Sequence, residues 1–298
     1  MMHEDQSAFS ISANIQEPDG IKPVGLMTRT ITAVAYGAVV LGAIALGPLS
    51  TGVVFGIMAG WAALEFYAMS RRESRLPNEF IGVAAAGSMP LAAALWGMAG
   101  LSAIMTALIA ASLVWHVVFV RVRTTDTATT VFGALYTGFL LAYLVLIIRD
   151  FAGGTELALA VVISVWVNDS FAYFFGSMLG RHKMAPRISP KKSWEGFVAG
   201  LVGTVVVWTL LVLAIPRFFP GLPQTGLSVA WALATGIAVG IAVVIGDLAE
   251  SRMKREAGVK DSGNALPGHG GFLDRLDSLI LVCLVAYWML YWGGATLR

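Results

Sequence analysis

Nine long apolar stretches constrain this chain more than any other feature of its sequence. A helix needs about 20 apolar residues to cross the hydrocarbon core of a bilayer, where unpaired backbone groups are costly. The stretches lie near residues 30–47, 52–70, 80–97, 101–120, 131–148, 156–178, 195–215, 228–247 and 276–293. Together with a charged fraction of only 13%, they predict an all-α polytopic integral membrane protein with about nine transmembrane helices.

The 20 lysines and arginines indicate how these helices are oriented, because short cytoplasmic loops are enriched in both residue types. With the N-terminus inside, 17 of the 20 fall in cytoplasmic segments. We therefore expect a cytoplasmic N-terminus and three parts. These are a polar tail over residues 1–28, five helices over residues 29–150, and four catalytic helices with two long cytoplasmic loops over residues 151–298.

Composition and motifs exclude several functions. A net charge of +2 is too small for a nucleic-acid footprint, and the single cysteine, Cys283, allows no intrachain disulfide and is expected to pack or to face lipid. Residues 263–269, GNALPGH, have histidine where a Walker loop needs lysine, and the sequence contains no HExxH, zinc-type Cys/His spacing or GxSxG.

Glu65 and His116 are interpreted as polar side chains that reach lipid headgroups from helix ends.

Asn168 and Asp169 interrupt the sixth apolar stretch. An acid at membrane depth costs roughly 2.5–3.5 kcal/mol on an insertion scale, so a compensating interaction is expected. One stripe at helical spacing runs along the same helix and comprises Asp169, Tyr173, Gly176 and Gly180. The stripe has two interpretations: a polar cavity, or an interhelical hydrogen bond beside small residues that allow close packing.

Lys191 and Lys192 lie in the cytoplasmic segment 181–196, RHKMAPRISPKKSWEG. Ser189 followed by Pro190 predicts an N-cap and a first helical residue, which puts both lysines in the first turn of the seventh helix. Cations there oppose the helix dipole, so a bound phosphate group would explain them. The enrichment of lysine in cytoplasmic loops explains them equally well.

The most informative segment covers residues 246–277, GDLAESRMKREAGVKDSGNALPGHGGFLDRLD. If the eighth helix continues to Gly258, four of its side chains share one face: Asp247, Ser251, Lys254 and Arg255. The glycine-rich loop that follows is able to fold backbone N–H groups around an anion. Asp274 and Asp277 then open the ninth helix on either side of Arg275.

The same segment also admits a purely structural interpretation, in which Glu250 pairs with Lys254 at i, i+4 and Asp274 caps the ninth helix. That interpretation does not account for so many carboxylates and cations at one membrane face. Hard oxygen ligands beside lysine and arginine are the combination that suits Mg²⁺ and a polyphosphate.

Residues 251–277, SRMKREAGVKDSGNALPGHGGFLDRLD, closely resemble the signature of the phosphatidate cytidylyltransferase, or CDP-diacylglycerol synthase, family. The resemblance extends back through ISPKKSWEG to NDSFAYFFG and covers residues 168–277. It implies transfer of CMP from CTP to phosphatidate with release of pyrophosphate, by a Mg²⁺-dependent homodimer in the bacterial inner membrane. The resemblance also allows K⁺ as a second cation. By position in the motif, Asp247 and Asp274 are the implied metal-binding pair.

Phosphatidate needs no general base, because the second pKa of a phosphate monoester is about 6 and the lipid phosphate is largely dianionic at neutral pH. Metal and cation clamps are expected to hold the attack in line. Candidates for phosphate contacts are Lys191, Lys192, Lys254, Arg255, Lys260 and Arg275. The other implied site residues are Asn168, Ser193, Ser251, Asp261, His269, Gly270 and Gly271, with Asp169 and Asp277 as auxiliary metal ligands.

Two other functions are compatible with parts of this pattern. A CTP-dependent polyprenol or phytol kinase would need a similar metal and nucleotide site but an alcohol acceptor. An ion-coupled transporter would also place acids in helices, yet it would not need a glycine-rich cytoplasmic loop that carries both signs of charge.

Overall fold

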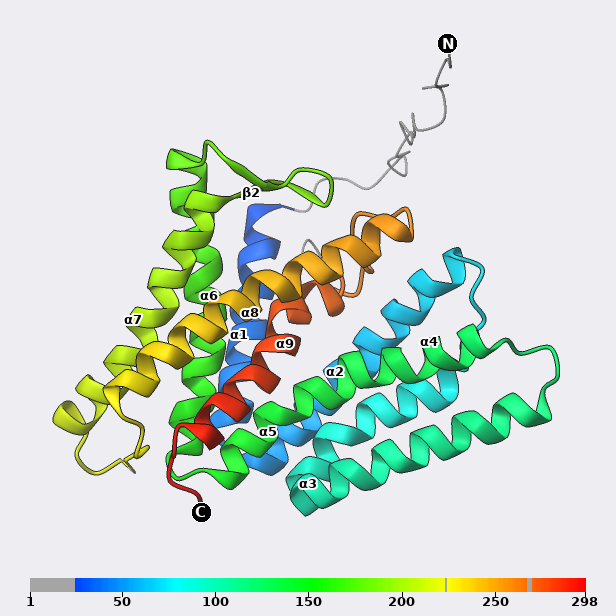
Figure 1. Ribbon diagram of the computed structural model, residues 1–298, viewed down its shortest axis with the longest axis horizontal. Coiled ribbons are helices and arrows are strands. Elements are labelled where there is room, and N and C mark those ends of the chain that lie inside the picture. Colours follow the sequence, from blue (N-terminus) through cyan, green and yellow to red (C-terminus); the bar gives the residue numbers. More distant parts are fainter. Residues whose placement is uncertain (1–24, 223, 267–269) are drawn as a thin grey trace, which may run out of the picture.

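The computed structural model describes residues 25–222, 224–266 and 270–298, which form a bundle of helices with one short β-hairpin (Figure 1). The elements, in chain order, are α1 (Leu26–Ala45), α2 (Pro48–Arg72), α3 (Glu79–Val118), α4 (Thr124–Ala134), the π-helix η1 (Leu135–Phe139), α5 (Leu140–Asp150), α6 (Gly154–Leu179), β1 (Lys183–Ala185), β2 (Ser189–Ser193), α7 (Trp194–Phe218), α8 (Val229–Glu256) and α9 (Leu273–Trp292). The described N-terminal end and the C-terminus lie at opposite ends of the bundle (Figure 1).

Seven helical stretches of the described residues are long and apolar enough to cross a membrane, with α4, η1 and α5 forming one of them. Large apolar side chains on several helices face outward, among them Leu113 of α3, Phe174 of α6 and Val206 of α7. Soluble proteins rarely expose apolar surface on this scale, whereas a bilayer accepts it without penalty. The chain is therefore an integral membrane protein.

Two of the predicted apolar stretches fall within α3, which is not one straight helix. Its backbone leaves the helical region at Gly97, with φ 63° and ψ −146°, and the chain reverses there (Figure 1). Arg149 of α5 donates from Nη1 to the backbone oxygens of Ala93 and Ala94, at 3.3 and 2.7 Å. A backbone that leaves the helical region interrupts the regular hydrogen bonding of the helix, and Arg149 supplies donors at this point, which hydrocarbon could not.

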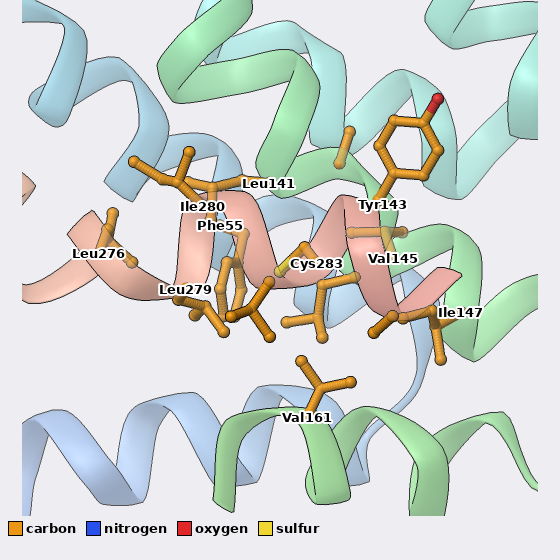
Figure 2. Packing of buried hydrophobic residues seen from close by; sticks show 14 of the residues in the cluster. Phe55, Leu141, Tyr143, Val145, Ile147, Val161, Leu276, Leu279, Ile280 and Cys283 are labelled. Carbon is orange, nitrogen blue, oxygen red and sulfur yellow. The ribbon is translucent and has the colours of Figure 1, made fainter. Parts of the chain in front are cut away.

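The core is built around α9 (Figure 2). Cys283 of α9 is fully buried, and the surrounding cluster includes Leu141 of α5, Phe55 of α2 and Val161 of α6. The sequence left open whether Cys283 packs or faces lipid, and it packs. Because α9 is surrounded on several sides, the residues at its start are held in a fixed position relative to the neighbouring helices.

Glycines allow α6, α7 and α8 to approach one another closely. A Cβ at Gly196 of α7 would lie 2.8 Å from the backbone oxygen of Ala172 and 3.2 Å from Cα of Gly176, both in α6. Between α7 and α8, Thr204 Oγ1 donates to the backbone oxygen of Gly236 at 2.8 Å. Small residues and interhelical hydrogen bonds are the usual means of packing helices in a membrane. This close packing brings polar side chains of α6, α7 and α8 near one another at one end of the bundle.

The chain before α7 is a β-hairpin, which corrects one prediction. β1 pairs antiparallel with β2, and α7 begins at Trp194 with Ser193 as its N-cap, whose hydroxyl accepts from the Gly196 amide at 3.2 Å. The prediction that Ser189 caps the helix, with Lys191 and Lys192 in its first turn, is wrong. Strand pairing continues to Ser193, and both strands of a two-stranded hairpin are edges, where proline is tolerated.

Candidate active site

Three carboxylates from three helices approach one another at the end of the bundle that carries the hairpin. Helix α8 can contact α9 closely because residue 246 is glycine, since a Cβ there would lie 2.7 Å from the backbone oxygen of Asp277. This approach brings Asp247 of α8 beside Asp277 of α9, and Asp169 of α6 lies within electrostatic range of both. Like charges repel, so cations are needed to balance the three carboxylates.

Lys192 of β2 supplies one of these cations. Its Nζ lies 2.7 Å from Oδ2 of Asp247, while the hydroxyl of Ser251 donates to Oδ1 of the same carboxylate at 3.1 Å. The side chains of Lys192 and Asp247 keep 23% and 29% of their surface exposed, so the pair remains accessible from an adjacent cavity. Lys192 therefore reaches the cluster of acids from a strand and not from a helix turn.

Lys254 balances two further carboxylates at once. Its Nζ lies 2.6 Å from Oε2 of Glu250, one helical turn away, and 2.7 Å from Oδ1 of Asp274 in α9. The predicted i, i+4 pair is thus confirmed. Glu250 is fully buried, and among the described residues neither of its oxygens has a hydrogen bond of ordinary geometry, so this carboxylate depends on its ion pair with Lys254. The same ammonium group ties the end of α8 to the start of α9.

Two cavities flank Asp169. The larger, of about 430 Å³, lies between α1, α6 and α9, and its lining includes Tyr36, Trp166, Asp169, Asp274, Arg275 and Asp277. The smaller, of about 270 Å³, lies between β2, α6, α7 and α8, and its lining includes Asn168, Asp169, Tyr173, Lys191, Lys192 and Asp247. The two cavities share one lining residue, Asp169. Around them lie charged side chains of two predicted segments, residues 181–196 and residues 246–277.

The stripe on α6 has two parts. Asp169 lines both cavities. Gly176 and Gly180, farther along the helix, pack against Ser193, because a Cβ at these positions would lie 3.2 and 2.6 Å from its Oγ. Asn168 is buried against Gly200, and its Nδ2 has no hydrogen-bond partner among the described residues.

The glycine-rich loop does fold its backbone N–H groups around an anion, and that anion is a carboxylate of the chain itself. The amides of Ser262 and Gly271 donate to Oδ2 of Asp274, at 3.0 and 2.8 Å. Gly270 has a φ of 80°, and a Cβ there would lie 2.6 Å from Oδ2 of Asp274. Asp274 therefore accepts hydrogen bonds both from the loop and from Lys254. It does not cap α9, the helix that contains it.

Glu65 is a residue of the site that the sequence analysis missed. It was expected to reach lipid headgroups, but only 7% of its surface is exposed. The amides of Phe272 and Leu273, at the start of α9, donate to its two oxygens at 3.0 and 2.9 Å. The prediction was wrong because the partners of Glu65 lie about 200 residues away. An acid within an apolar stretch was the available signal.

Some predicted site residues do not join the cluster. Arg255 is exposed and donates from Nη1 to the backbone oxygen of Val259 at 2.9 Å, whereas Lys254 contacts Glu250 and Asp274. Lys260 and Asp261 are also exposed. His269 lies outside the described residues. The amide of Gly271 donates to Asp274.

The carboxylates fit Mg²⁺ by donor type, since hard oxygen ligands are those the ion prefers. Among residues 25–222, 224–266 and 270–298, no three His, Cys, Asp or Glu side chains are arranged to hold a metal ion. Asp247 and Asp274, the implied metal-binding pair, are each paired with a different lysine. The donors are therefore present, and each is held by a lysine.

The apolar bundle and its cluster of carboxylates and lysines define a polytopic membrane protein with a site for charged groups at one end. The chain belongs to the cytidylyltransferase family, whose model matches residues 27–292. It is similar to phosphatidate cytidylyltransferases from Thermotoga maritima (44% identical over 153 residues) and Haemophilus influenzae (43% over 126). A third, from Bacillus subtilis, is 39% identical over 159 residues.

These matches cover 51%, 42% and 53% of this chain and 55%, 42% and 56% of the respective relatives. The chain therefore spans about half the length of the curated relatives it matches. Family membership rests on the longer match to the family model, which includes both the hairpin and the glycine-rich loop.

Removing the charge of Lys254 is expected to destabilise the protein strongly. Lys254→Met leaves two buried carboxylates without their cation, which should lower the free energy of unfolding by about 3–5 kcal/mol. Adding Glu250→Gln should recover part of the loss, because one of the two uncompensated charges is then gone. Lys260→Met, at an exposed position, is the control and should stay within about 0.5 kcal/mol of wild type in a denaturation series. Equal stabilities of Lys254→Met and the control would contradict the account.

Proposed function

We propose that this chain transfers CMP from CTP to phosphatidate, giving CDP-diacylglycerol and pyrophosphate. The observation that carries the proposal is the meeting of Asp247, Lys192 and Lys254 with the acids of α6 and α9 beside two cavities. Membership of the cytidylyltransferase family supports it, as do relatives named phosphatidate cytidylyltransferase. The signature in residues 251–277 lies at the same place in the fold.

The chain's own residues suit attack by a lipid phosphate on the α-phosphorus of CTP. Both reactants are anionic, so the main obstacle is their mutual repulsion, which lysines next to a cavity reduce. Lys191 and Lys192 line the smaller cavity, and Arg275 lines the larger one. Acyl chains can stay in the bilayer while CTP arrives from the aqueous side, which explains a site at one end of the helices.

Mg²⁺ would be held by Asp247 and Asp274, with Asp169 and Asp277 as auxiliary ligands. When bound, the ion would neutralise phosphate charge in the transition state. In that state Lys192 and Lys254 would no longer be needed to balance these carboxylates alone and could turn toward phosphate oxygens. K⁺ as a second cation and a homodimeric assembly are further expectations of the same proposal.

The fate of label from CTP distinguishes this reaction from its rivals. Purified protein given phosphatidate, Mg²⁺ and CTP labelled at the α-phosphate should move label into a chloroform-soluble lipid. Label at the γ-phosphate should leave as pyrophosphate, and chelation of Mg²⁺ should stop transfer. A polyprenol or phytol kinase would instead place γ-label in lipid, and an ion-coupled transporter would transfer neither. Either outcome with folded protein would overturn the proposal.

We also propose nine spans with the N-terminus in the cytoplasm of a bacterial cell and the site facing the same side. The chain reversal at Gly97 supports counting α3 twice, and the Arg149 hydrogen bonds support a stable turn there. Helix α9, which is not one of the seven long apolar stretches, would be the ninth span. The bacterial relatives support placement in the inner membrane.

Cysteine accessibility tests this topology. On a Cys283→Ala background, single cysteines at exposed positions Ser74 and Arg121 should react with an impermeant thiol reagent only when the cytoplasmic side is open. A cysteine at exposed Gln224 should react in intact cells, because it lies between α7 and α8 on the opposite side. Labelling of position 74 or 121 from outside would contradict the model of nine spans.

A further inference from the structure

Glu65 is a buried acid in α2, far in the sequence from residues 251–277, which carry the family signature. Its carboxylate nevertheless makes three hydrogen bonds to those residues. It accepts from the amides of Phe272 and Leu273 and from the hydroxyl of Ser262, at 3.0, 2.9 and 2.8 Å. The amides at a helix N-terminus lack partners within the helix, so Glu65 of α2 caps α9 from outside. Burial keeps water from replacing these bonds.

Ser262 joins Glu65 to the carboxylate of Asp274. Its Oγ lies 2.8 Å from Oε2 of Glu65 and 3.0 Å from Oδ2 of Asp274, and its amide also donates to Asp274 at 3.0 Å. A hydroxyl has one proton and donates to one carboxylate at a time. The two acids are thus linked through one side chain, and the orientation of Asp274 depends on a loop that Glu65 holds.

Two glycines of the loop make room for this carboxylate. A Cβ at Gly263 would lie 2.6 Å from Oε1 of Glu65, and a Cβ at Gly271 would collide with Oε2. The loop therefore fits around the carboxylate on two sides. A side chain that served only to fill space would not need its oxygens directed at two amides and a hydroxyl.

We propose that Glu65 is a positioning residue, which fixes the glycine-rich loop and the start of α9 so that Asp274 is directed toward the divalent cation. The inference rests on the proposed function for the role of Asp274 as a metal ligand. It gives the N-terminal helices a part in the site, because α2 supplies the group that holds the signature loop in place. Partners that orient a metal ligand typically change metal affinity by about 10–100-fold when they are removed.

Glu65→Gln is the main test, because it keeps the shape of the side chain and one accepting oxygen. Its amide nitrogen would face the Leu273 N–H or the Phe272 N–H, so one charge-assisted hydrogen bond is lost. The matched control is Glu73→Gln, at an exposed position that directly follows α2. Ser262→Ala is a second, milder variant, which removes the hydroxyl between Glu65 and Asp274 but keeps the Ser262 amide bond to Asp274 and leaves Glu65 charged.

Hydrogen exchange of the substrate-free protein gives a readout that does not depend on activity. In Glu65→Gln, amides of residues 262–266 and 270–273 should exchange about tenfold faster, while those of α5 and α6 stay unchanged. The Mg²⁺ concentration that gives half-maximal activity should rise about tenfold, and the Mg²⁺-induced increase in melting temperature should shift to higher Mg²⁺ in parallel. Ser262→Ala should show the same changes to a smaller extent, and Glu73→Gln none.

Two results would overturn the inference. One is loop exchange in Glu65→Gln equal to that of wild type. The other is faster loop exchange with an unchanged Mg²⁺ requirement, since Glu65 would then hold the loop without positioning a metal ligand. If Glu65→Gln fails to fold, Ser262→Ala is judged by the same two criteria. A wild-type protein that binds Mg²⁺ but transfers no CMP would refute the proposed function alone, because exchange and Mg²⁺-induced stabilisation still test Glu65.

Discussion

The ion pairs of Lys254 are the interaction on which the rest of the site depends. Burying a carboxylate away from water costs several kcal/mol unless a cation or hydrogen bonds compensate for it. Lys254 compensates for Glu250 in its own helix and for Asp274 in α9. Because the loop amides and Glu65 are arranged around Asp274 and the start of α9, the position of this one ammonium group fixes two helices and the loop between them.

Close helix packing provides the second requirement. Glycines at 196 and 246 let α6, α7, α8 and α9 approach until polar side chains from different helices face a common space. The result is a cluster in which each aspartate has an identified partner or cavity. Asp247 has Lys192 and Asp274 has Lys254, while Asp169 lines both cavities and Asp277 lines the larger one. In the proposed reaction, a metal ion and phosphate groups would take the place of these lysine partners.

The sequence predicted the features that depend on local pattern. Apolar length gave the helices, and spacing gave the Glu250–Lys254 pair and the extension of α8 close to Gly258, whose φ of 69° ends it. It failed where contacts that helical spacing does not show decide. Ser189 resembled a helix cap, but pairing of β2 with β1 extends to Ser193. Glu65 was expected at lipid headgroups, but its partners Phe272 and Leu273 lie about 200 residues away in the sequence.

Metal binding by the substrate-free protein tests the central claim most directly, namely that Asp247 and Asp274 hold a divalent cation beside the lysines. Mn²⁺ binding can be followed by electron paramagnetic resonance on detergent-solubilised protein, with Mg²⁺ as competitor. Wild type and Glu73→Gln should bind Mn²⁺ alike, whereas Asp247→Asn and Asp274→Asn should each weaken binding at least about tenfold. Binding by both aspartate variants as tight as that of wild type would contradict the account.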